Sequence, residues 1–305
     1  MNKIPVFKKD DLIYFKPQHK SFVGIDSDGC VFPTMEIKQK QCFHTVIIEH
    51  WGLQKIEPYV RETAEFVNLY SLHRGQNRFP CLCLVFDLLG NRPEVIHSGV
   101  KLPDLTSLKA FIDSGLPLAH PALESQAKAT NDPALASVLQ WSLAVNETIA
   151  QTVKNVPPFP FARESLEKIN TQSDAICVSQ TPTEALVREW EENQLMGFVK
   201  VIAGQELGTK TDHLRMATEQ RYRPEKVLMI GDALGDLNAA LGVKACFFPI
   251  NPGHEADSWE LFYTEAYDQF LNGTYIGTYE HKLIAEFRQL LPETPPWKAT
   301  GRERM

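Results

Sequence analysis

Short apolar runs without polar alternation recur along the chain. The first is "FVGI" at 22–25, and after a long gap four more follow, at 175–178, 198–202, 227–230 and 245–250. Such runs are typical of strands buried on both faces, as in parallel sheets. Segments with helical spacing separate the later runs, at 183–194, 211–221 and 236–241. The alternation predicts a doubly wound α/β fold with a parallel sheet.

The long gap after the first run has a different pattern. Its apolar residues recur three and four positions apart, as at Ile56, Val60, Ala64 and Val67. This spacing predicts amphipathic helices, which we expect at 41–51, 56–72, 82–89, 105–114 and 133–153. We therefore expect an all-helical domain, residues 38–159, inserted into an α/β domain made of residues 1–37 and 160–305.

The last part of the chain predicts two more helices, at 256–271 and 279–291. The remaining stretch, "PETPPWKATGRERM", is rich in proline and then charged. We expect this tail to be frayed.

Composition narrows the class of protein. Of the 305 residues 43% are hydrophobic and 23% are charged, as in ordinary globular proteins. The net charge of −7 argues against a general affinity for nucleic acid or anionic membranes. The six cysteines show no zinc-binding spacing, so we expect buried free thiols in a reducing, cytoplasmic environment. The N-terminal residues do not resemble a signal peptide, and no apolar run approaches the ~20 residues of a membrane span.

Carboxylates follow two of the predicted strands. Asp26 and Asp28 come directly after the first, while Asp232 and Asp236 belong to "GDALGD" after the fourth. Open α/β sheets bind ligands at the carboxyl ends of their strands, so we expect the four groups at one edge. Two like charges about 4 Å apart repel by about 4 kcal/mol at an effective dielectric of about 20, which predicts a bound cation.

Other polar groups are expected at the same edge. Ser179 and Gln180 follow the second strand and precede a helix, and Lys210 stands at the start of another. Hydroxyl, ammonium and helix N–H groups suit a phosphate, and carboxylates suit Mg²⁺. With these groups in place, Asp26 can act as a nucleophile that forms an aspartyl-phosphate, and Asp28 can act as the general acid and base.

Four motifs in order, "DSDG", "CVSQT", "GTK" and "GDALGD", resemble the signature motifs of the haloacid dehalogenase-like superfamily of phosphohydrolases. The resemblance implies an α/β core, Mg²⁺ and a cap domain inserted after the first motif. It implies that Asp26, the Asp28 carbonyl and Asp232 bind the metal, with Asp236 close by, and that Ser179 and Lys210 bind phosphate.

Two positions depart from the motif pattern. Cys30 replaces the usual threonine after the first-motif glycine. Lys210 lacks the proline that commonly follows the third-motif lysine, so Lys200 remains an alternative for its role.

The predicted helical domain offers one candidate substrate-binding loop, "LHRGQNRFP" at 72–80. Arg74 and Arg78 are candidates to contact an anionic part of the substrate. The alternative is a solvated loop whose arginines pair with neighbouring acids.

Together these features predict a Mg²⁺-dependent phosphatase that hydrolyses a small phosphorylated metabolite. Asp28 favours a leaving group that needs a proton, as an alcohol does. A phosphomutase of the same family and a catalytically weak metabolite-binding or regulatory protein remain alternatives. The sequence predicts neither the substrate nor the oligomeric state.

Overall fold

The computed structural model describes residues 5–299, and they form two compact units. The α/β unit comprises the described residues up to Met35 together with Asn155–Leu291. The helical unit comprises Glu36–Lys154 and the described residues from Pro292 onward. The first two divisions fall two and five residues before those expected from the sequence, whereas the described residues from Pro292 onward were expected in the α/β domain and belong to the helical unit.

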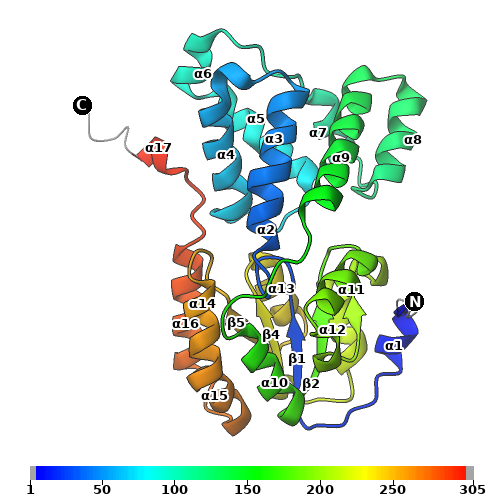
Figure 1. The fold of residues 1–305 in the computed structure, drawn as a ribbon, viewed down its shortest axis with the longest axis vertical. Helices are drawn as coiled ribbons and strands as arrows, with labels where there is room; N and C mark the ends of the chain where they lie inside the picture. Colours follow the sequence, from blue (N-terminus) through cyan, green and yellow to red (C-terminus); the bar gives the residue numbers. More distant parts are fainter. Residues whose placement is uncertain (1–4, 300–305) are drawn as a thin grey trace. The chain divides into compact units, whose positions relative to one another are not determined.

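A five-stranded parallel sheet forms the centre of the α/β unit (Figure 1). The strand order is β3-β2-β1-β4-β5, so the first strand lies in the middle. The strands are β1 (Phe22–Ile25), β2 (Asp174–Val178), β3 (Ile202–Ala203), β4 (Val227–Gly231) and β5 (Cys246–Pro249). The prediction of a parallel α/β sheet is confirmed.

Helices cover both faces of this sheet because alternate strand residues point in opposite directions. Val23 and Ile25 of β1 belong to one apolar cluster and Phe22 to another. The helices of this unit are α1 (Lys9–Ile13), α10 (Ala162–Gln172), α11 (Thr183–Glu192), α12 (Lys210–Thr218), α13 (Leu234–Gly242), α14 (Glu255–Leu261), α15 (Tyr267–Asn272) and α16 (Thr278–Gln289). Burial on both faces explains the uninterrupted apolar runs.

One predicted strand is wrong in its position. The run 198–202 was expected to be a strand, but residues 196–198 form a 3₁₀ turn and β3 begins only at Ile202. β3 lies at the edge of the sheet and pairs only with β2. With a partner on one side only, fewer residues are held in an extended conformation.

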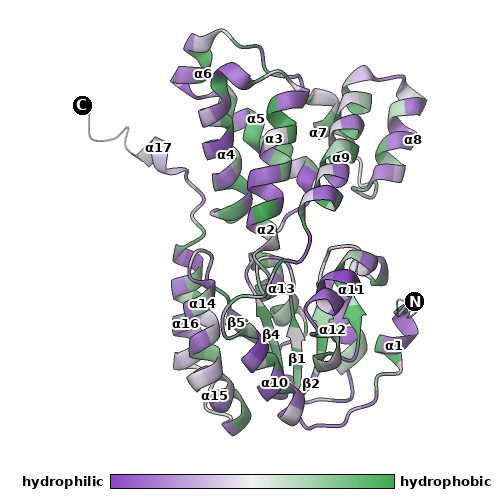
Figure 2. Cartoon of the chain, in the orientation of Figure 1, coloured by the Kyte–Doolittle hydropathy of each residue, from purple (hydrophilic) through white to green (hydrophobic). Residues whose placement is uncertain are grey.

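The helical unit contains no strand among its described residues and has its own apolar core. In Figure 2 its helices carry hydrophobic and hydrophilic bands, as expected for helices with one buried face. They are α3 (His44–His50), α4 (Glu57–Leu69), α5 (Arg78–Gly90), α6 (Pro93–Ser98), α7 (Thr106–Asp113), α8 (His120–Thr130), α9 (Pro133–Thr152) and α17 (Pro296–Ala299). A short α2 (Thr34–Ile37) and a π-helical turn at Lys38–Phe43 lead into the unit.

The C-terminal tail is not frayed as far as the structure describes it. Residues 296–299 form α17, and the indole of Trp297 packs against the core of the helical unit. The tail was expected to fray because it is rich in proline and then charged, but its tryptophan packs against the core of the helical unit. The remaining residues of the tail, 300–305, lie outside the described part.

The six cysteines are buried free thiols, as expected. None of the helices in the described part of the chain combines the length and the apolar character that crossing a bilayer requires.

Candidate active site

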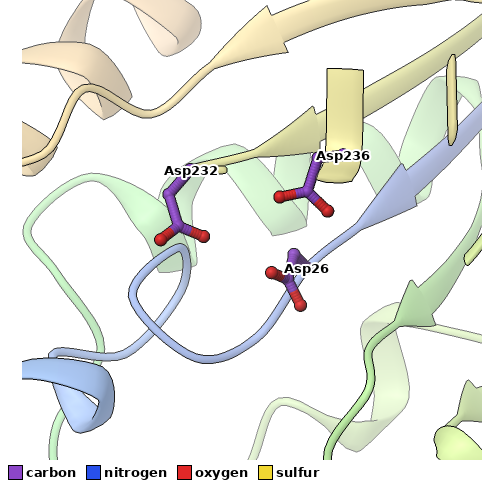
Figure 3. Close-up of side chains that lie close together, drawn as sticks. All are labelled: Asp26, Asp232 and Asp236. Carbon is purple, nitrogen blue, oxygen red and sulfur yellow. The ribbon is translucent and has the colours of Figure 1, made fainter. Parts of the chain in front are cut away.

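Three carboxylates converge at the carboxyl ends of the central strands (Figure 3). Asp26 follows β1, Asp232 follows β4, and Asp236 lies in the first turn of α13. One oxygen from each lies within 4.8 Å of the others, and their exposed fractions are 3%, 0% and 0%. The sheet brings these groups together because β1 and β4 are parallel neighbours that end at the same edge.

The backbone fixes Asp26 and Asp236 closely. The Asp26 amide donates to the Ile230 carbonyl at 3.0 Å, which extends the β1–β4 ladder by one residue. Asp236 Oδ2 accepts from the Ala233 amide at 3.1 Å and so stabilises the start of α13. A Cβ on Gly231 would lie 2.3 Å from the Asp236 side chain, so only glycine allows this close approach.

Lys210 lies between two of the carboxylates. Its Nζ donates to Asp26 Oδ2 at 2.7 Å and to Asp236 Oδ1 at 2.6 Å. Burial opposes the charged form, but Asp236 and Asp26 outweigh it and raise the pKa of Lys210. The ammonium therefore stays charged and neutralises part of the acidic cluster.

The acidic cluster brings negative charge into a buried site. Burial raises the pKa of Asp236 to about 6; Lys210 acts against this shift and Asp26 adds to it. Lys210 contacts two of the three buried carboxylates, and oxygen donors crowded in this way suit a hard divalent cation. The donor set therefore fits Mg²⁺.

Asp28 lies in the tight turn that follows Asp26. Gly29, with φ of 77°, closes this turn by donating its amide to the Phe32 carbonyl at 2.8 Å. The Asp28 carboxylate accepts from the hydroxyl of Thr34 and, at 2.6 Å, from the hydroxyl of Thr181. Two hydroxyl donors thus hold the carboxylate at the same edge of the sheet.

Sequence reasoning missed the contribution of both threonines. Thr181 was visible in "SQT" as a hydroxyl after β2, but nothing linked it to Asp28. Nothing in the sequence pointed to Thr34, since its hydrogen bond to Asp28 depends on the turn that Gly29 permits.

The two expected phosphate-binding residues after β2 lie at this edge as well. Ser179 is buried, and its Oγ accepts from the Thr181 amide at 3.3 Å. Gln180 Nε2 donates to the Gly208 carbonyl at 3.0 Å, two residues before Lys210. Gln180 therefore contacts the loop that leads to the lysine.

Lys200, the alternative to Lys210, lies elsewhere. It forms an ion pair with the buried carboxylate of Asp174, the first residue of β2. This is the amino end of the strand, opposite to the end that Ser179 follows. The geometry thus favours Lys210 over Lys200.

The two candidate arginines belong to the helical unit. Arg74 Nη1 donates to the Leu69 carbonyl at 2.9 Å. Arg78 was expected in a loop, but it is the first residue of α5, and its Nη1 donates to Ser142 and Asn146. Burial lowers the pKa of Arg78 to about 10. Its three bonds to α9 are internal contacts of this unit.

Comparison with known proteins gives structural likenesses at low identity. No protein-family model and no curated protein matches the chain. A solved structure from Bacteroides fragilis, described as a haloacid dehalogenase-like hydrolase, has a TM-score of 0.49 at 13% identity and covers 78% of this chain and 92% of its own. A Thermotoga maritima protein described as a beta-phosphoglucomutase has a TM-score of 0.44 at 13% identity and covers 75% of this chain and 84% of its own. A Streptococcus pneumoniae hydrolase of the haloacid dehalogenase-like family has a TM-score of 0.39 at 15% identity and covers 79% of this chain and 90% of its own. At these scores the likeness by itself assigns no activity.

Proposed function

We propose that the chain is a Mg²⁺-dependent phosphatase of the haloacid dehalogenase-like superfamily. Its substrate would be a small phosphorylated metabolite. The observation that carries the proposal is the cluster of Asp26, Asp232 and Asp236 with Lys210 at the carboxyl ends of a parallel sheet. Buried acids gathered beside a lysine are suited to bind a cation and a phosphate.

In the proposed reaction Asp26 is the nucleophile. One of its carboxylate oxygens bonds to phosphorus, and the bond between phosphorus and the leaving oxygen breaks. Asp28 gives its proton to that leaving oxygen and so releases an alcohol. Water then attacks the aspartyl-phosphate, Asp28 takes up the proton, and inorganic phosphate leaves with Asp26 regenerated.

The remaining residues hold charge in place. Lys210 and Ser179 would bind phosphoryl oxygens, while Gln180 would keep the loop before Lys210 in position. Asp26, Asp28, Asp232 and Asp236 would hold Mg²⁺, Asp28 through its carbonyl. The ion, when bound, neutralises negative charge on the phosphoryl group. Arg74 and Arg78 are proposed as contacts for another anionic part of the substrate.

The test is hydrolysis of p-nitrophenyl phosphate by the purified protein. We expect phosphate release with Mg²⁺ and none with EDTA, and we expect Asp26→Asn to lower kcat by ~10³-fold or more. Asp257→Asn, which changes an aspartate that is 80% exposed on α14, is the matched control. Full activity of Asp26→Asn excludes Asp26 as the nucleophile.

The same assay tests water as the acceptor. With a sugar phosphate as substrate, we expect inorganic phosphate to appear as fast as substrate disappears. Isomerised sugar phosphate without release of phosphate would instead indicate a mutase.

A further inference from the structure

The chain crosses between the two units three times. It enters the helical unit after Met35, leaves it after Lys154, and enters it again after Leu291. An inserted domain requires only the first two crossings. The third is an additional covalent connection, made by the C-terminal segment.

The first two crossings run side by side. In the α/β unit, the Phe159 amide donates to the Val31 carbonyl at 2.9 Å, which joins the two linkers. In the helical unit, the π-helical turn at Lys38–Phe43 packs against α9. Two neighbouring linkers act as a single hinge, and a hinge alone leaves the helical unit free to rotate.

The third connection starts from a fixed point in the α/β unit. Phe287 of α16 is fully buried and its ring lies 5.7 Å from that of Phe247 on β5. Leu291, just after this helix, is also buried in the same apolar cluster. The chain is therefore anchored beside β5, a strand at the edge of the sheet, whereas the hinge follows the central strand.

The connection ends at a fixed point in the helical unit. The Trp297 ring packs edge-on against Phe66 of α4, with 5.5 Å between ring centroids. The guanidinium of Arg92 lies 4.5 Å from the Trp297 centroid and 4.9 Å from that of Tyr59. Arg92 is itself held by an ion pair with Glu62 at 2.6 Å. Trp297 is thus anchored on α4 and on the residue before α6.

The segment between the two anchors is short and stiff. It spans six residues from Leu291 to Trp297, and three of the five residues between them are prolines. Six residues reach at most about 20 Å, and proline restricts the backbone further. The two anchors can therefore be no further apart than about that length.

We propose that residues 292–297 form a strap that limits how far the helical unit moves away from the α/β unit. While both anchors hold, any motion that would carry Leu291 and Trp297 further apart than the strap can reach is blocked. The strap acts through its length and its anchor, and it does not depend on the chemistry proposed for Asp26.

The experiment measures the distance between the units by electron spin resonance on the full chain. Nitroxide labels are attached at Ser125→Cys on α8 and Glu219→Cys at the end of α12, both exposed positions, while the six native cysteines are buried. Three further changes are compared in this labelled protein. Trp297→Ala removes the anchor, ten Gly/Ser residues inserted between Glu293 and Thr294 lengthen the strap, and Lys298→Ala alters the exposed neighbour of the anchor as a control.

We expect the lengthened strap to extend the upper edge of the distance distribution by roughly 15 Å, since ten flexible residues add about that span. Trp297→Ala, which releases the strap from its anchor, should extend that upper edge as well. Lys298→Ala should give the parent distribution. The lengthened variant is decisive because it keeps Trp297 and its contacts. An unchanged distribution in that variant overturns the proposal, whatever Trp297→Ala does.

Discussion

At the scale of single residues, the least expected feature is the pair of hydroxyls on Asp28. Thr34 and Thr181 each donate to one of its two carboxylate oxygens. A general acid and base must keep one orientation towards the leaving oxygen, and small misplacements are costly to the rate. The threonines are therefore positioning residues in the proposed reaction.

Thr181→Val tests this role. Valine has nearly the same shape but no hydroxyl, so we expect kcat to fall by roughly 10-fold with KM changed by less than about 2-fold. Thr181→Ser keeps the donor and should recover most of the lost kcat. Equal losses in the two variants would show that the methyl group, and not the hydroxyl, matters.

A second residue prediction concerns the contact between Gly231 and Asp236. In Gly231→Ala the new Cβ would lie 2.3 Å from Asp236, so the carboxylate must move and leave Lys210. We expect kcat/KM to drop by about 100-fold or more.

The matched control is Gly235→Ala in the first turn of the same helix, where an added Cβ meets nothing within 4 Å. Its activity should stay within about 2-fold of the parent protein. Similar losses in both alanine variants would mean that α13 as a whole, and not Asp236, is disturbed.

At the scale of elements, α12 contains two residues in positions that are unfavourable in themselves, a lysine at its start and a buried histidine. Lys210 is the first residue of this helix, where the positive end of the helix dipole repels an ammonium group. Asp26 and Asp236 offset that repulsion. The imidazole of His213, one turn further on, is fully buried.

His213 makes the stability of the folded protein depend on pH. Burial lowers its pKa to about 4, against about 6.5 in an unfolded chain. Below pH 6.5 the unfolded state binds the proton more readily, so stability is complete above that pH and is lost as the pH falls towards 4. The loss at pH 4 amounts to about 3 kcal/mol.

We expect His213→Gln to reduce this loss, so that its thermal midpoint falls less than that of the parent protein between pH 7 and pH 4.5. His281→Gln, at an exposed position on α16, serves as the control and should follow the parent protein. Parallel curves for all three proteins would exclude His213 as the source.

The sequence predicts elements well where burial alone decides them. β1, β2, β4 and β5 lie within one residue of their apolar runs, because strands buried on both faces tolerate only such residues. Asp26 and Asp232 were predictable for the same reason, since Asp26 directly follows such a run and Asp232 follows one after a single glycine. β3 was misplaced, because edge pairing leaves a weak pattern, and the helices α1, α6, α8 and α10 were missed.

At the scale of the whole molecule, acids from distant parts of the chain form one buried cluster. Asp26 lies about 200 residues before Asp232 and Asp236, and the three are nearly inaccessible. Only folding brings them together, so the folded state holds the electrostatic repulsion that a cation would relieve. Binding of such a cation is therefore coupled to the stability of the fold.

We expect Mg²⁺ to raise the thermal midpoint of the parent protein. At 100 times the dissociation constant a ligand adds about 2.7 kcal/mol, which corresponds to roughly 5–10 °C for a unit of this size. Asp232→Asn removes one carboxylate and should abolish most of the shift, whereas Asp257→Asn should keep it. A shift of equal size in Asp232→Asn would place the ion elsewhere.

The middle position of β1 has a consequence for how the chain is made. Phe22 pairs with Asp174 on one side and with Val227 on the other, so a ribosome must add roughly 150 residues before either neighbour exists. At about 5–20 residues per second this takes on the order of 10–30 s. During synthesis the helical unit can form its own core. The apolar strand β1, which the proposed nucleophile Asp26 directly follows, stays unpaired in this time. Newly made protein is therefore most exposed to aggregation in this interval, and chaperones that shield the nascent N-terminal segment should raise the yield of folded protein.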